Sequence, residues 1–257
     1  MYPILIHWGP LTIHTYGALL ALGAALGLWL LGRLAQSSGL DPERVSGLAL
    51  WVLLSGLLGS RAAFVLIEPQ ALAGQPWRFF AIWDGGLVFY GGVALALPVG
   101  VWLGRRWKLP GLKLLDCFAP ALALGQVFGR LGCFSAGCCY GQPWRGPWSV
   151  VFRDPQSLAP RGIPLHPAQL YSSGALLLIF VILMLLWPRR GYPGRIFFTY
   201  GLLHGLARVI IEQFRGDWRG EPLWGTLTPT AVFALGLAAV SFVALLILSR
   251  RNKLKEA

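Results

Sequence analysis

Long apolar blocks alternate with shorter polar segments along this chain. The blocks cover seven ranges: 14–32, 46–67, 86–104, 114–133, 168–187, 195–213 and 227–249. Each block is close to the roughly 20 residues that a helix needs to cross a hydrocarbon layer about 30 Å thick. The pattern therefore predicts an all-α polytopic membrane protein with about seven transmembrane helices.

The longest polar segment, 134–167, separates the fourth block from the fifth and is rich in Gly, Pro and Trp. We expect a head loop or a re-entrant segment there. With no internal repeat or soluble module in the sequence, we expect a single integral membrane domain over residues 1–257. We also expect no cleaved signal peptide, because the first apolar block has no basic segment before it and no clear cleavage site.

Composition and charge support this class and predict an orientation. The sequence is 56% hydrophobic and only 12% charged, whereas soluble domains are nearer a quarter charged. Every lysine lies in one alternate set of polar segments, which includes Lys108, Lys113 and the C-terminal tail. Because lysine and arginine concentrate on the cytoplasmic side, we expect the N-terminus outside, the C-terminus in the cytoplasm and 134–167 on the outer face. The net charge of +12 then reflects orientation and anionic lipid, and we expect no nucleic acid partner.

Ionisable residues inside apolar blocks mark candidate functional positions, because a charge in the membrane is costly. Arg208 and Glu212 are four residues apart and share one helix face, so they could form a purely structural pair. For Arg61 we expect the side chain to reach the membrane interface. Arg130 has no acidic residue within a turn and needs a partner from another helix or from a ligand. Since arginine suits two-pronged recognition of phosphate, these positions suggest a phospholipid head-group site.

Three cysteines, Cys133, Cys138 and Cys139, follow Arg130 closely, and Cys117 stands apart. The cluster lacks the paired C-x2-C spacing and the nearby histidines of zinc sites, so we expect no metal. Three interpretations remain open: the cysteines could form a disulfide, serve as small packing residues, or include a thiolate activated by the neighbouring guanidinium.

Two further segments carry candidate chemistry. His166 precedes the fifth block, and Tyr90 precedes Gly91 and Gly92 in the third. Both aromatic residues could simply lie at the membrane interface. The paired glycines permit close approach of a neighbouring helix or of a ligand.

Taken together, four motifs in this order resemble the prolipoprotein diacylglyceryl transferase family of bacterial inner membranes. The motifs are Gly9-Pro10-Leu11-Thr12-Ile13-His14-Thr15-Tyr16-Gly17, Gly129-Arg130-Leu131-Gly132 followed by Gly141, His166-Pro167-Ala168-Gln169-Leu170-Tyr171, and Arg208-Val209-Ile210-Ile211-Glu212-Gln213-Phe214-Arg215. The resemblance covers nearly the whole chain.

The resemblance implies transfer of a diacylglyceryl group from phosphatidylglycerol to the thiol of a lipobox cysteine in a lipoprotein precursor, without a cofactor. It implies that Arg130 and Arg208 hold the phosphate, that Glu212 orients Arg208, and that Tyr16 hydrogen-bonds the head group. Further substrate-binding positions that we expect on this basis are Gly91, Gly92, Cys133, Gly141, His166, Gln169, Tyr171 and Arg215.

The sequence departs from the family pattern at four positions where chemistry is expected. Cys133, Ala136 and Cys138 stand where the family has asparagines and an acidic residue, and Tyr90 stands where it has a histidine. One hypothesis is a transferase in which Tyr90, His166, Cys138 or Cys139 handles the proton. The alternative is that Cys133, Cys138 and Cys139 perform thiol-based redox or group-transfer chemistry on a different substrate. Lipid binding or transport without turnover is a third and weaker hypothesis, because we find no inverted repeats.

Overall fold

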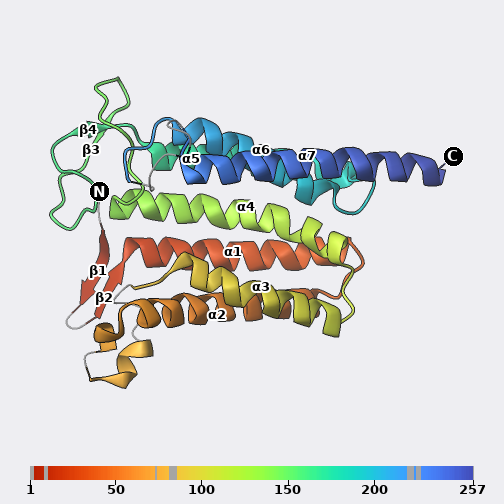
Figure 1. Cartoon of the computed structure of the whole chain (residues 1–257), viewed down its shortest axis with the longest axis horizontal. Coiled ribbons are helices and arrows are strands. Elements are labelled where there is room, and N and C mark those ends of the chain that lie inside the picture. The colour runs from red at the N-terminus through yellow and green to blue at the C-terminus, as the bar shows by residue number, and fades with distance from the viewer. Residues whose placement is uncertain are drawn as a thin grey trace. The chain divides into compact units, whose positions relative to one another are not determined.

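The computed structural model describes residues 3–8, 11–72, 74–80, 86–218, 223 and 227–256, and most of that part is helical (Figure 1). Its α-helices are α1 Thr15–Ser37, α2 Pro42–Ile67, α3 Phe89–Arg106, α4 Gly111–Ala136, α5 Ala168–Leu186, α6 Arg195–Glu212 and α7 Pro229–Glu256. Each predicted apolar block corresponds to one of these helices, so the all-α class is confirmed.

Five of the helices, α1, α2, α4, α5 and α7, are long and apolar enough to cross a membrane. The α5 span continues through a short 3-10 helix, Trp187–Arg189. The other two helices, α3 and α6, have 18 residues each. The described chain is therefore a polytopic membrane protein, while the count of seven spans stays a prediction.

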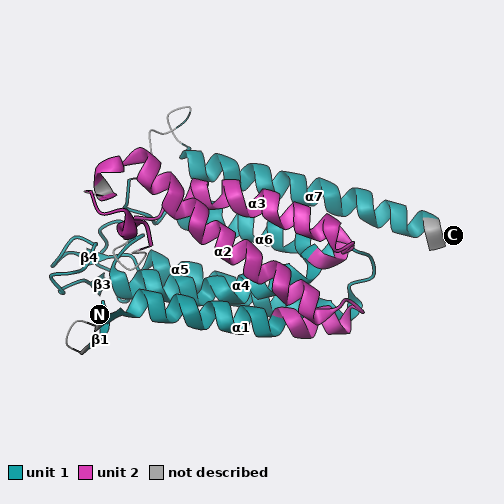
Figure 2. Cartoon of the chain, turned by 90° about the horizontal axis from the view of Figure 1, so that it is seen from below, with its two compact units in different colours: residues 1–30, 115–257 teal, residues 31–114 magenta. Residues whose placement is uncertain are grey.

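The helices divide between two compact units (Figure 2). Unit 1 consists of Met1–Leu30 and Leu115–Ala257, and unit 2 of Leu31–Leu114. Unit 2 is thus an insertion in the sequence of unit 1, and it begins within α1. The single membrane domain that we expect over residues 1–257 remains a prediction.

In unit 2, α2 and α3 pack closely through small residues. A Cβ atom added to Gly91 would collide with Ala63 and with the carbonyl oxygen of Gly59, and one on Gly92 would collide with Ser60. Small residues allow such close backbone approach between membrane helices. The close approach that Gly91 and Gly92 permit is therefore made by a neighbouring helix, and their role in ligand binding stays a prediction.

Arg61 of α2 is buried, with only 5% of its surface exposed. Its guanidinium donates to three backbone carbonyl oxygens: Nε to Phe79 at 3.0 Å, Nη2 to Arg78 at 2.6 Å and Nη1 to Gly86 at 3.2 Å. Arg78 and Phe79 belong to the 3-10 helix Pro76–Phe80, which follows another, Pro69–Leu72. Carbonyls of the α2–α3 connection satisfy the charge of Arg61 inside the unit. The expectation that its side chain reaches the membrane interface stays a prediction.

Unit 1 also relies on small residues where its helices meet. A Cβ atom on Gly23 of α1 would lie 2.8 Å from the carbonyl oxygen of Gly125 of α4. On α6, a Cβ atom on Gly205 would lie 2.6 Å from the carbonyl oxygen of Ala234 of α7. These contacts bring α1 close to α4, and α6 close to α7 (Figure 1).

A buried carboxylate on α4 caps the start of α6. Asp116 is 3% exposed and accepts the backbone N–H of Gly194 at 2.6 Å and that of Phe197 at 2.9 Å. The first N–H groups of a helix have no intrahelical partner and favour a negative charge. Gly194 has no side chain to supply a cap, so Asp116 supplies it from another helix.

The structure also contains two pairs of short strands, which the sequence analysis did not predict. One pair precedes α1, and the other lies between α4 and α5. Strands β1 (Ile4–Trp8) and β2 (Leu11–His14) form an antiparallel hairpin, as do β3 (Val150–Val151) and β4 (Pro164–Leu165). The segment 134–167 folds around a small core of Phe152, Ala159 and Leu165. Gly9 and Pro10 of the opening motif lie outside the described residues.

Candidate functional site

Three chain segments of unit 1 are joined by backbone hydrogen bonds beyond the ends of α4 and α6. Gln142 donates to the carbonyl of Phe214 at 2.9 Å and accepts the N–H of His166 at 2.9 Å, and Gly141 pairs with Arg215 in a β-bridge. A Cβ atom on Gly141 would collide with the carbonyl oxygen of His166. Only glycine fits where these segments meet. The meeting point brings together three predicted site residues, Gly141, His166 and Arg215.

Aromatic side chains surround His166. Its ring stacks on Trp144 at 4.3 Å between centroids and 9° between planes, and Phe214 meets it edge-on at 5.2 Å. Its Nδ1 lies 3.1 Å from the hydroxyl of Tyr171, which also accepts the indole N–H of Trp148 at 2.8 Å. Burial lowers the pKa of His166 below its usual value, which favours a neutral imidazole at neutral pH. His166 and Tyr171, two candidate site residues, are thus neighbours. Trp144 and Trp148, which contact them, were not among the candidates from the sequence.

Arg208 and Glu212 form the expected pair on α6. Nη2 of Arg208 lies 2.8 Å from Oε2 of Glu212, whose side chain is only 4% exposed. The other carboxylate oxygen accepts the hydroxyl of Thr228 at 2.9 Å, and that hydroxyl in turn accepts the N–H of Ala231. Thr228 is thereby the N-cap of α7. Glu212 fixes Arg208 and links it to the start of the next helix.

Arg215 is buried and engaged by the chain itself. Its Nε and Nη2 donate to the two carboxylate oxygens of Asp217 at 2.9 and 2.8 Å. Such a two-pronged pair is among the strongest hydrogen-bonded arrangements. Arg215 also helps to lower the pKa of the Cys139 thiol, through a hydrogen bond and through its positive charge. The sequence analysis did not foresee the pair with Asp217, and a substrate role for Arg215 stays a prediction.

Arg130, near the end of α4, has different surroundings. Within the described residues its guanidinium forms no ion pair. It acts electrostatically on Tyr16 and on Cys133. Gly132 lets the ring of Tyr16 approach, because a Cβ atom there would lie 3.0 Å from that ring. The structure thus brings Tyr16, Arg130 and Cys133 together at the start of α1 and the end of α4.

Polar side chains of α4 and α6 contact one another near the two arginines. The hydroxyl of Tyr200 donates to Oε1 of Gln126 at 3.1 Å, and its ring stacks on His204 at 5.3 Å. Both Arg130 and Arg208 act electrostatically on His204. The two guanidiniums therefore both lie within electrostatic range of His204. Gln126 and Tyr200 escaped the sequence analysis because single polar residues barely change the hydropathy of a long apolar block.

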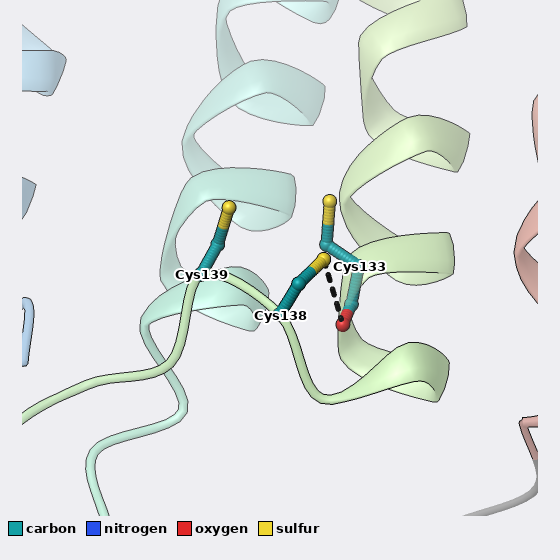
Figure 3. A group of neighbouring side chains, drawn as sticks. All are labelled: Cys133, Cys138 and Cys139. Atoms are coloured by element: carbon teal, nitrogen blue, oxygen red, sulfur yellow. Dashed lines mark hydrogen bonds between the residues drawn. The ribbon is translucent and has the colours of Figure 1, made fainter. Parts of the chain in front are cut away.

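The three cysteines gather into one cluster, although they are spaced unevenly in the sequence (Figure 3). All three are free thiols, their sulfur atoms lie within 4.8 Å of one another, and Sγ of Cys138 donates to the carbonyl oxygen of Cys133 at 3.7 Å. The left-handed backbone of Gly137 (φ 76°) and Cys139 (φ 57°) turns the chain back toward α4. Hydrogen bonds from the thiols of Cys133 and Cys138, together with Arg215, lower the pKa of Cys139.

Gln169, a predicted site residue, secures this turn. Its side chain is fully buried and its Nε2 donates to the carbonyl oxygen of Cys138 at 2.8 Å. Tyr90, by contrast, belongs to unit 2, where it lies in the first turn of α3 and is 81% exposed. Its proposed part in catalysis stays a prediction.

The fold and this cluster define a class: a polytopic membrane protein in which arginines and thiols meet at the ends of α4 and α6. A family model described as prolipoprotein diacylglyceryl transferase matches residues 3–247. The chain is 35% identical to the phosphatidylglycerol–prolipoprotein diacylglyceryl transferase of Clostridium tetani, over 86% of this chain and 88% of the relative. It is 33% identical to that of Parasynechococcus marenigrum, over 96% and 90%, and 30% identical to that of Pseudomonas putida strain GB-1, over 88% and 86%. The chain belongs to the prolipoprotein diacylglyceryl transferase family, which confirms the resemblance.

Proposed function

We propose that this protein transfers a diacylglyceryl group from phosphatidylglycerol to a cysteine thiol of a lipoprotein precursor. Its relatives carry the name of this activity. The observation that carries the proposal is that Arg130, whose charge acts on Tyr16, forms no ion pair with any described residue. A charge in an apolar helix is expensive unless an opposite charge meets it. An anionic lipid phosphate is the partner that fits this arginine.

In this reaction the two arginines bind the phosphate and stabilise the charge that grows on it. The sulfur of the acceptor cysteine attacks the carbon of the diacylglyceryl unit that bears the phosphate ester. The new C–S bond forms as that C–O bond breaks, and glycerol phosphate leaves with the electron pair. Donors placed where charge develops lower the barrier most. Arg130 and Arg208 fill this role, Glu212 orients Arg208 through their 2.8 Å contact, and Tyr16 hydrogen-bonds the head group.

The acceptor thiol must lose its proton before or during the attack. Tyr90, His166, Cys138 and Cys139 are the candidate groups. The lowered pKa of His166 suits a neutral imidazole, which can accept a proton, and the lowered pKa of Cys139 suits a thiolate. Gly141 and Gln169 support the site by the backbone contacts described above, and Tyr171 supports it through its hydrogen bond to His166.

The membrane arrangement that we propose has seven spans, with α3 and α6 crossing alongside the five longer helices. The N-terminus lies outside, the C-terminus in the cytoplasm of a bacterium, and the segment 134–167 on the outer face of the inner membrane. The distribution of lysines supports this orientation. The lipid substrate would then reach the site from the surrounding bilayer, and the precursor from the outer leaflet.

One observation favours the second candidate, thiol-based chemistry on a different substrate: three free sulfurs lie within 4.8 Å of one another. Complementation of a bacterial strain depleted of its own transferase separates the two functions. We expect the wild-type gene to rescue growth and to restore diacylglyceryl-modified lipoproteins. Rescue that survives simultaneous Cys133→Ser, Cys138→Ser and Cys139→Ser would exclude the thiol-based function. A well-expressed wild-type protein that does not rescue would refute the transferase proposal.

A further inference from the structure

We propose that Cys133, Cys138 and Cys139 form a binding site for a soft metal cation, of which Cu(I) is the type. The site does not depend on the transferase proposal, and it goes against the expectation that the spacing of these cysteines excludes a metal. That expectation rested on the sequence spacing and on the lack of nearby histidines. The structure instead provides the positions of the three sulfur atoms.

The three sulfurs already have the spacing that one metal ion requires. They lie within 4.8 Å of one another, and each cysteine offers one ligand atom. Three sulfurs that surround an ion in a plane at about 2.3 Å lie about 4 Å apart. Small rotations of the side chains, such as release of the 3.7 Å contact from Cys138 to the carbonyl of Cys133, would close the set.

The backbone that carries the sulfurs is fixed without a metal. Cys133 lies in the last turns of α4, and the left-handed Gly137 leaves no room for a side chain, because a Cβ atom there would collide with Ser157. The fully buried Gln169 holds the carbonyl of Cys138 from α5. A site held in this way loses little conformational entropy when it binds an ion.

Charge and ligand number favour a monovalent soft ion. Three thiolates around Cu(I) carry a net charge of −2. The guanidiniums of Arg130 and Arg215, which act on Cys133 and Cys139 respectively, oppose that charge. Among the described residues no histidine or carboxylate joins the three sulfurs as a fourth ligand. Structural Zn(II) sites almost always have four ligands, whereas soft thiolates also select Cu(I).

Titration of the purified, reduced protein with Cu(I) in competition with a chromogenic Cu(I) chelator tests this site, with Zn(II) in a parallel series. We expect one Cu(I) per chain. Each of Cys133→Ala, Cys138→Ala and Cys139→Ala should weaken binding by at least about tenfold, the effect of losing even an indirect supporting residue. Cys117→Ala is the matched control, because this fourth cysteine lies elsewhere on α4, and it should bind as the wild type does.

Alkylation of the wild-type protein is a second test. It needs no substitution, so no folding defect of a variant can affect it. Under reducing conditions, Cu(I) should protect Cys133, Cys138 and Cys139 from alkylation, as mass spectrometry of the peptides would show. Equal alkylation with and without Cu(I), binding that survives the triple alanine variant, or a site that takes Zn(II) and rejects Cu(I) would each overturn the proposal.

Discussion

Arg61 and Arg130 both interrupt apolar helices, yet their surroundings differ. In unit 2, Arg61 is 5% exposed and donates to three backbone carbonyl oxygens of the α2–α3 connection. In unit 1, Arg130 is half-buried and forms no ion pair with any described residue, while it acts on Tyr16, Cys133 and His204. Backbone carbonyls satisfy the charge of Arg61, whereas no described residue forms an ion pair with Arg130.

This difference teaches how to separate a structural charge from a functional one in a membrane protein. A buried charge whose hydrogen-bond partners are backbone carbonyls holds a segment in place, and its loss destabilises the fold. A charge that lacks such partners awaits an anion, and its loss removes an interaction with a ligand. Neither arginine has an acidic neighbour one turn away, so sequence alone does not separate the two cases.

The largest effect that we expect is that of Arg130→Ala on catalysis. Loss of a charge that stabilises the leaving phosphate should reduce transfer by on the order of 100- to 1000-fold. Transfer of labelled diacylglyceryl groups from phosphatidylglycerol to a lipobox peptide measures it. The matched control is Arg153→Ala, because Arg153 is exposed in the 134–167 segment and should leave the rate unchanged. Near-normal turnover of Arg130→Ala would show that the head-group site lies elsewhere.

Arg61→Ala should instead act on stability. Three carbonyl oxygens would lose a charged donor, so we expect the free energy of unfolding to fall by about 2–4 kcal/mol. Denaturant unfolding in detergent micelles measures this, and Arg61→Met, which keeps most of the aliphatic stem, separates lost hydrogen bonds from lost packing. If Arg61→Ala unfolds like the wild type and instead loses transfer, the contrast between the two arginines fails.

Asp116 extends the same comparison to an acidic residue. Its carboxylate accepts two N–H groups at the start of α6, so we classify it as a structural charge. Replacement by alanine should lower the free energy of unfolding by about 0.5–2 kcal/mol, the range found for lost helix caps. Asp116→Asn, which keeps one acceptor oxygen, should lose less. Equal losses in the two variants would contradict the capping role.

The smallest effect concerns His166 and pH. Burial lowers its pKa in the folded protein, while the unfolded value stays near about 6.5. As the pH falls below about 6.5, the unfolded chain therefore takes up this proton more readily, and the folded state loses stability; above that value the contribution is fully retained. Unfolding of the wild type between about pH 7 and about pH 5 should show this loss, and His166→Gln should reduce it. An unchanged pH dependence in His166→Gln would assign the effect to other groups.

Sequence reasoning predicted the helices well because each apolar block is a long, local signal. It also predicted the pair of Arg208 and Glu212, whose four-residue spacing fixes their distance on a helix. It did not predict the cap from Asp116 to Gly194, the hydrogen bonds of Arg61 or the cluster of Cys133 with Cys138 and Cys139. These contacts depend on turns and on partners far along the chain, and hydrophobic periodicity carries no information on either.

Lipid binding tests most directly whether Arg130 holds the phosphate of an anionic lipid. Native mass spectrometry or calorimetry in detergent would compare phosphatidylglycerol with phosphatidylcholine, which carries no net charge, for the wild type, Arg130→Ala and Arg153→Ala. We expect the wild type and Arg153→Ala to prefer phosphatidylglycerol, and Arg130→Ala to lose this preference. Retention of the full preference for phosphatidylglycerol by a folded Arg130→Ala protein would contradict it.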